Sequence, residues 1–396
     1  MGTKDQVGAV LTRAEHAAGM ADYVADGERR AKELGNRGPV RFDADGKVHP
    51  EIIDAFNEHG FYVFEGVVSA TEIDELRADA NEMIERAPVR KGADLDAKGR
   101  PALGRDYAID PYVMIKPLSD PWGGTDALAG RHPSKMTEAV ADEGTPEEVP
   151  YLLFGICQAM PAALRMYGHP HLMAIAEAIN GPDFVPYNDA IFVKQAGLGG
   201  PVAWHQDGVT HWDSPNWDAG IHGFNFQIQL YPTTAANALW VVPGTHKRGR
   251  LDIKGLVAAN GGSDRLPDAV PLLCEAGDVT IVNRQMLHGS FANTSPDVRL
   301  SVTCGFHRRS SVLGVRGKLK LRTVDGRKDE GDLYDEQRVF DRSAVIAVAI
   351  DARHQHNPDE EPYVYQPFVG LEDDFRFNEE TFERVLKDYN TKDLAI

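Results

Sequence analysis

The sequence predicts a mainly β protein, built as a sandwich or barrel with flanking helices. From Phe184 onward, short runs rich in β-branched and aromatic residues alternate with Gly, Pro and Asn, which is typical of such folds. Before that point, apolar residues recur at helical spacing, which predicts helices beside the sheets. The expected strands are 184–194, 202–205, 224–231, 239–242, 279–283 and 299–306.

Residues 1–40 form the expected N-terminal extension. Apolar residues over 14–34 have helical spacing, but Gly19, Gly27 and Gly35 weaken that pattern. We therefore expect a mobile arm or an oligomer contact in this part of the chain.

The main domain is expected over residues 41–311, and its first part is helical. A helix over 49–59, ended by Gly60, precedes a short strand over 61–64. The capping-box pattern Ser69–Glu72 then marks the start of a second helix.

A long insertion is expected at about residues 90–150, because this stretch is rich in Gly, Pro and charge. Ordered loops of this length often act as lids or binding loops. Two helices, over 151–167 and 172–179, are expected to follow it.

After the β-rich region, residues 312–396 form the expected C-terminal extension, packed on the core or at the contact of a homodimer. Within it we expect a strand over 344–350 and a helix over 379–389.

Composition narrows the class of protein. The formal net charge of −18 over 396 residues argues against a nucleic-acid or anionic-membrane surface. Three Cys without paired spacing exclude a disulfide scaffold and fit a reducing compartment. The longest apolar run, 344–350, is far shorter than the roughly 18 residues of a membrane span. Without a signal-peptide pattern at the first residues, we expect a cytoplasmic protein.

A candidate metal site begins at the end of the strand 202–205. His205 and Asp207 stand two positions apart, so an extended chain places both side chains on one face. Of the three His-x-acid pairs in the chain, only this one follows a strand in the β-rich region. His288 ends the run 279–288 and is the expected third ligand. Two His and one carboxylate form the facial triad of non-haem Fe(II) sites, which leaves positions open for a co-substrate and O2.

A candidate anion site lies eleven positions beyond His288. Arg299 offers a planar guanidinium that binds a carboxylate bidentately. On a strand, Arg299, Ser301 and Thr303 share one face. This face therefore presents a cation and hydroxyl groups to an anion.

Together these motifs, in this order, resemble the phytanoyl-CoA dioxygenase-like family of Fe(II)/2-oxoglutarate oxygenases over about residues 48–309. The resemblance implies a double-stranded β-helix, or jelly roll, with iron on His205, Asp207 and His288. It also implies that Arg299 binds the 2-oxoglutarate C5 carboxylate, with Ser301 assisting. The implied reaction is the oxidation, foremost hydroxylation, of a C–H bond in a small organic substrate by O2, with release of succinate and CO2. The segments that carry the resemblance are Gly60–Gly66, Trp204–Asp207, Asn237–His246, His288, Arg299 and Ser301.

Further contacts to cofactor and substrate are expected around this site. Asn225 and Gln227 share one face of their strand, which either faces solvent or points into a pocket. We expect Gln227 to contact the cofactor, near the position where some family members have an aromatic residue, and Asn225 to contact the substrate. On the preceding strand, Lys194 and Tyr187 are candidates for contacts to 2-oxoglutarate or substrate. The remaining candidates, which form either an aromatic rim over the substrate or ordinary loop packing, are His211, Trp212 and Trp217.

Two alternative functions remain open at this point. One is a metal-dependent hydrolase or isomerase on the same barrel, which the Arg299 and Ser301 pair disfavours. The other is a non-catalytic binding protein on this scaffold, which the intact triad disfavours. The sequence does not identify the substrate.

Overall fold

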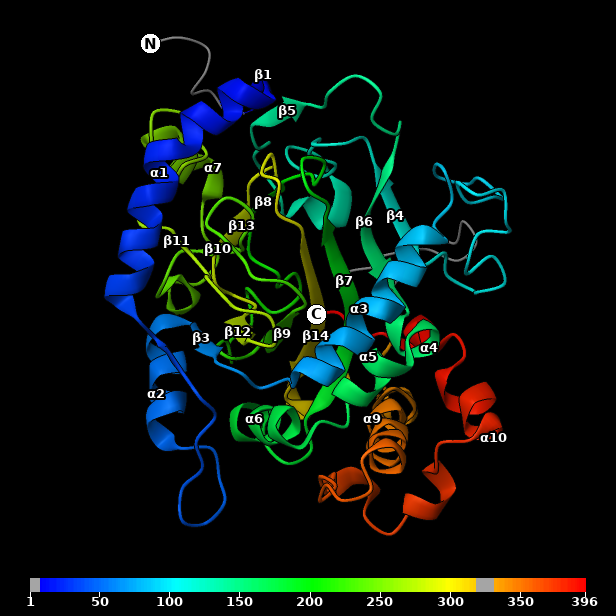
Figure 1. The fold of residues 1–396 in the computed structure, drawn as a ribbon. Coiled ribbons are helices and arrows are strands. Elements are labelled where there is room, and N and C mark those ends of the chain that lie inside the picture. The colour runs from blue at the N-terminus through cyan, green and yellow to red at the C-terminus, as the bar shows by residue number, and fades with distance from the viewer. Residues whose placement is uncertain (1–7, 318–330) are drawn as a thin grey trace.

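The computed structural model describes residues 8–317 and 331–396, with two β-sheets at its centre (Figure 1). Within those residues, the larger sheet has eight strands in the order β2-β3-β12-β9-β14-β7-β6-β4. All its neighbouring strands are antiparallel except the pair β2–β3. The strands are β2 (Arg37–Gly38), β3 (Phe61–Phe64), β12 (Val279–Asn283), β9 (Phe224–Gln229), β14 (Arg299–His307), β7 (Val185–Lys194), β6 (Val149–Phe154) and β4 (Tyr112–Ile115).

The smaller sheet is antiparallel and has the order β11-β10-β13-β8. Apolar side chains of β3 and β12 pack against those of β10 and β11, so the two sheets face each other. In the described residues the two sheets stay separate and do not close into a continuous barrel. This arrangement confirms the predicted mainly β, jelly-roll fold with flanking helices. The strands of the smaller sheet are β11 (Val270–Pro271), β10 (Trp240–Val241), β13 (His288–Ser290) and β8 (Val202–His205).

Apolar and polar residues alternate along β9, which gives this part of the larger sheet one apolar and one polar face. Phe224, Phe226 and Ile228 belong to the large apolar core on the outer face, whereas Asn225 and Gln227 line a chamber between the sheets. The expected polar face is therefore buried and does not face solvent. Helices cover the outer face (Figure 1). They are α2 (Pro50–His59), α3 (Ala70–Glu85), α5 (Pro161–Met166), α6 (Pro170–Asn180) and α9 (Glu336–His356).

Helix α1 (Arg13–Leu34) corrects the expectation of a mobile N-terminal arm. It begins with a capping box and packs on the smaller sheet, where Tyr23 stacks on Trp240 with ring centroids 4.7 Å apart. The Tyr23 hydroxyl donates to the Leu266 carbonyl at 2.7 Å. Gly27, which seemed to weaken the helix, lies directly against the Trp240 ring. A Cβ at this position would collide with the ring, so the close packing requires glycine. The predicted capping box of α3 is confirmed as well.

Two other expectations about single elements are wrong. Residues 151–154 belong to strand β6, not to a helix, and this strand pairs with β4 and β7. Residues 344–350 lie inside helix α9 and not in a strand. Both are short apolar runs, and a fully buried segment of either type lacks the periodicity that separates helix from strand.

The expected insertion at residues 90–150 contributes strand β4 to the larger sheet and several residues to the site. It contains β4, the helical turn Ala127–Gly130 and β5 (Glu138–Val140), which pairs with β1 (Val10–Thr12). Near the C-terminus, the chain returns to the core, where the Leu394 amide donates to the Tyr187 carbonyl of β7. Over the described ranges, every helix is too short or too polar to span a lipid bilayer.

The remaining α-helices are α4 (Ile156–Ala159), α7 (Ile253–Ala259), α8 (Arg309–Val312) and α10 (Glu379–Thr381).

Candidate functional site

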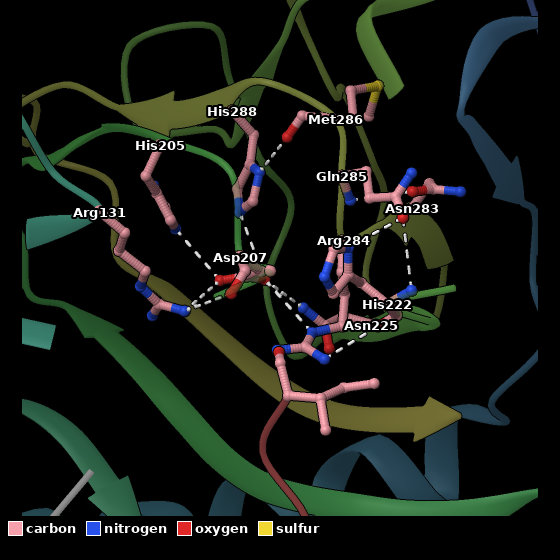
Figure 2. A network of polar contacts seen from close by, with 12 residues as sticks. Arg131, His205, Asp207, His222, Asn225, Asn283, Arg284, Gln285, Met286 and His288 are labelled. Carbon is pink, nitrogen blue, oxygen red and sulfur yellow. Dashed lines mark hydrogen bonds and ion pairs between the residues drawn. The ribbon is translucent and has the colours of Figure 1, made fainter. Parts of the chain in front are cut away.

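Three potential metal ligands converge between the two sheets (Figure 2). His205 ends β8 and His288 begins β13, and the two residues are direct partners across this antiparallel pair. Their ring centroids are 4.1 Å apart. Asp207 follows β8 by two residues, and one ligand atom from each of the three residues lies within 4.8 Å of the others. All three side chains are buried.

Backbone contacts orient the two imidazoles. His205 Nδ1 and His288 Nδ1 each lie 2.8 Å from a backbone carbonyl, those of Ala203 and Met286. A ring that donates from Nδ1 presents an unprotonated Nε2, which is the form that binds a metal. Burial lowers the pKa of His288 to about 3, so this ring stays neutral.

The Asp207 carboxylate has a separate donor for each oxygen. Arg131 Nη1 lies 2.9 Å from Oδ1, and Asn225 Nδ2 donates to Oδ2 at 2.8 Å. Arg284 Nε lies 3.9 Å from Oδ2. Burial by itself would raise the pKa of Asp207, but the Arg131 charge and the His205 contact lower it well below its usual value. Asp207 is therefore an ionised, fixed carboxylate.

Arg299 lies at the start of β14, fully buried. Its Nε donates to Ser301 Oγ at 2.9 Å, its Nη2 to Gln227 Oε1 at 3.0 Å and its Nη1 to the Asn237 carbonyl at 3.4 Å. Burial lowers the pKa of Arg299 to about 10. No acidic side chain of the described residues forms an ion pair with it. A buried cation held by neutral acceptors is a ready site for an anion.

A chamber of about 500 Å³ joins the metal ligands to Arg299. This volume lies within the range of small-molecule sites, roughly 300–1,000 Å³. Besides Arg299, three of the predicted cofactor and substrate contacts line the chamber, namely Gln227, Tyr187 and Asn225. Ser301 lies behind Arg299 and donates to Gln229 Oε1 at 2.6 Å.

Other predicted contacts lie outside this chamber. The Lys194 ammonium is buried and donates to the carbonyls of Gly200 and Phe291. Burial, and then the Arg299 charge, lowers the pKa of Lys194 well below its usual value. His211, Trp212 and Trp217 are not among the chamber-lining residues either. His211 Nε2 lies 2.7 Å from the Ser311 carbonyl, and Trp212 Nε1 donates to the Gly208 carbonyl.

Sequence reasoning missed two basic residues at the site. Arg131 comes from the insertion, 76 positions before Asp207, and no spacing marks it. Arg284 is buried and its guanidinium lies over the Tyr187 ring, 4.1 Å from the centroid. A charged residue between the strand 279–283 and His288 was the available signal for it.

Known proteins resemble this chain in sequence, and solved structures resemble it in part. Phytanoyl-CoA dioxygenase from Arabidopsis thaliana is 22% identical over 264 residues, which cover 64% of this chain and 87% of that protein. Phytanoyl-CoA dioxygenase 1 from Oryza sativa subsp. japonica is 32% identical over 110 residues, which cover 26% of this chain and only 37% of that protein. The structure of EctD from S. alaskensis with 2-oxoglutarate and 5-hydroxyectoine has a TM-score of 0.49 and 18% identity, over 75% of this chain and 90% of that chain. The 2-oxoglutarate-dependent carbocyclase SnoK from nogalamycin biosynthesis has a TM-score of 0.45 and 19% identity, over 68% of this chain and 87% of that chain.

A family assignment follows from the sequence model of Phytanoyl-CoA dioxygenase (PhyH). This model matches residues 56–301, which is more than half of the 396 residues. The chain therefore belongs to the phytanoyl-CoA dioxygenase family, which confirms the predicted family and enzyme class.

Proposed function

We propose that this protein is an Fe(II)- and 2-oxoglutarate-dependent dioxygenase that hydroxylates a C–H bond of a small organic substrate. His205, Asp207 and His288 hold the iron, and Arg299 holds the far carboxylate of 2-oxoglutarate. The observation that carries the proposal is the buried Arg299, without an acidic partner, in the same chamber as the three ligands.

The donor set suits Fe(II). Two neutral imidazoles and one carboxylate form the facial triad of non-haem iron oxygenases. The Nε2 atoms of His205 and His288 lie 3.4 Å and 3.7 Å from the Asp207 carboxylate oxygens, so all three donors face one point. When bound, iron and 2-oxoglutarate supply the oxidising chemistry with O2 that yields succinate and CO2.

The chain's own residues position these groups and shield them from water. Arg131 and Asn225 fix the Asp207 carboxylate, while Ser301 and Gln227 fix the Arg299 guanidinium. Positioning, metal geometry and a dry pocket are what a protein adds to such cofactor chemistry.

Several finer statements belong to the same proposal. The acidic chain has a small-molecule substrate and no nucleic-acid partner, acts in the cytoplasm and forms a homodimer through its N- or C-terminal extension. Its oxygenase domain spans residues 41–311. The charge of −18 supports the exclusion of nucleic acid.

The test is an anaerobic titration of the metal-free protein with Fe(II) and then 2-oxoglutarate, followed by visible absorption. A weak charge-transfer band that needs both additions is expected for the wild type, and it should be absent from His288→Ala. Arg299→Gln should bind Fe(II) normally but need at least about 30-fold more 2-oxoglutarate for the band, because a buried charge-assisted contact is lost.

Arg299→Lys is the matched control, because it keeps the charge and loses only the planar fork. It should fall between the wild type and Arg299→Gln. Iron binding without any band in the wild type would contradict the 2-oxoglutarate assignment and favour a hydrolase or isomerase.

A further inference from the structure

We propose that the substrate is a compact organic anion with an apolar body, bound through Arg131, and not a coenzyme A thioester. This inference rests on the proposed function and adds the chemical class of the substrate. It comes from the shape and charge of the chamber described above.

One wall of the chamber is apolar. Strands β6 and β7 place Leu152 opposite Phe192 and Phe154 opposite Ala190, and Met114 of β4 adds to this wall. The same wall continues into a buried apolar cluster on these strands. Apolar and aromatic walls of this kind bind the hydrocarbon body of a ligand.

The opposite end of the chamber is polar and basic. Tyr187 lines it, and its electrostatic neighbours are Arg284, Asp207 and Arg131. The Tyr187 hydroxyl can donate a hydrogen bond to an acceptor of the ligand.

Arg131 is the cation at this end. Its Nη1 contacts the carboxylate and the backbone carbonyl of Asp207, at 2.9 and 3.1 Å. Arg131 also lines the chamber. A guanidinium has five N–H donors, so donors beyond those on Nη1 remain for a ligand.

The site carries more positive than negative charge once the cofactors are bound. The two positive charges of Fe(II) and the charge of Arg299 balance the two carboxylates of 2-oxoglutarate and that of Asp207. Arg131, with 12% of its side chain exposed, and the buried Arg284 then remain, both beside the same Asp207 carboxylate. Of these two cations, Arg131 is the one that lines the chamber. Excess buried positive charge is costly, so a substrate anion beside Arg131 is favoured.

The chain holds Arg131 in place through a tight turn. Leu128, Ala129 and Gly130 all have positive φ, at 52°, 60° and 68°. Two successive non-glycine residues in this region are strained, and strain of this kind clusters at functional sites. Arg131 therefore follows a constrained stretch of backbone.

The entrance does not suit coenzyme A, which carries several phosphate groups. Among the described residues that line the chamber, the exposed charged ones are Lys91 and Asp110, of opposite sign. Phosphate recognition uses clusters of Arg or Lys. A free acid fits the entrance and the net charge of −18 better than a thioester.

The test measures binding, not turnover. Isothermal calorimetry under anaerobic conditions, with Fe(II) and saturating 2-oxoglutarate, compares phenyl-, cyclohexyl- and naphthyl-propanoate with their amides and coenzyme A thioesters. At least one carboxylate should bind about tenfold more tightly than its amide, as expected for a charge-assisted contact. Arg131→Gln should abolish that preference, and the visible band shows that each variant still holds iron and 2-oxoglutarate.

Two further variants keep the result interpretable where Arg131→Gln fails to hold iron. Arg131→Lys should keep the preference for the carboxylate, and Tyr187→Phe should weaken carboxylate binding about threefold through one lost hydrogen bond. Equal binding of acid and amide, no carboxylate binding, or tightest binding of a thioester would overturn the proposal. A preference lost in Arg299→Gln but kept in Arg131→Gln would overturn it too. Absence of the band in the wild type would instead contradict the proposed function.

Discussion

At the scale of single residues, the Asp207 carboxylate shows how strongly the site is prepared for a metal. Each oxygen accepts from its own donor, Arg131 or Asn225, so the carboxylate is held at both oxygens. Contacts of this kind behind a metal ligand typically change metal affinity by about 10–100-fold. The residues around the ligands therefore matter nearly as much as the ligands.

Asn225→Leu should weaken Fe(II) binding by about tenfold, because Asp207 Oδ2 loses its hydrogen-bond donor. The measurement is an anaerobic Fe(II) titration. Thr303→Val is the matched control, because Thr303 lines the same chamber and its buried hydroxyl has no partner within the described residues. Equal losses in the two variants would mean that the Asn225 contact has no specific effect on the metal.

The sequence allowed His205, Asp207, His288 and Arg299 to be predicted as one group, and the structure brings them to one chamber. Their order and their places at strand ends carry that information. Arg131 was not predictable, because its position depends on how a long insertion folds back over the site. Local periodicity says nothing about such a long-range contact.

At the scale of elements, helix α1 packs closely on the Trp240 ring, because Gly27 has no side chain. A side chain at Gly27 would meet the Trp240 ring, whereas a Cβ at Gly19 meets only Arg265 Nη1 at 3.9 Å. The sequence treats both glycines alike, as residues that weaken a helix. Only the packing of α1 on the smaller sheet separates them.

Gly27→Ala should lower the melting temperature, because α1 must move away from the sheet to relieve the collision. Gly19→Ala should leave it unchanged or raise it, since Ala is favoured over Gly in a helix by about 0.5–1 kcal/mol. Differential scanning calorimetry of both variants checks the prediction. A gain in stability from Gly27→Ala would show that α1 does not pack this tightly.

Elements were predictable where the hydrophobic pattern alternates and unpredictable where it does not. All six expected strands of the β-rich region form, within a few residues of their expected ends. The alternation in β9, with aromatic residues on one face and amides on the other, reflects its two different surroundings. By contrast, residues 151–154 are buried throughout, and 344–350 are buried except for the partly exposed Ala347 and Ile350, so these apolar runs show no clear period.

At the scale of the whole molecule, buried neutral histidines tie stability to pH. Burial, and then the charge of Lys194, lowers the pKa of His16 to about 4, and burial followed by Arg353 does the same for His169. In the unfolded chain, histidine titrates near about 6.5. As the pH falls from about 6.5 to 4, the unfolded state takes up protons that the folded state does not, so the free energy of unfolding decreases.

Urea denaturation at pH 7 and pH 4.5 should show this loss, at most about 1.4 kcal/mol for each pKa unit and group. Replacing His16 by Gln removes one of the titrating groups. The variant should therefore lose less stability than the wild type over the same pH interval. An identical loss would show that His16 does not contribute.

The pairing of His205 with His288 across one β-ladder has a consequence for how the protein must be handled. Because backbone hydrogen bonds of the smaller sheet fix the spacing of the two imidazoles, this spacing does not by itself select Fe²⁺ over other divalent metals. Cu²⁺, Ni²⁺ and Zn²⁺ bind N/O sites more tightly than Fe²⁺ in the Irving–Williams order. Protein isolated on nickel resin or from zinc-containing media will therefore carry the wrong ion, so chelation must precede any assay of activity.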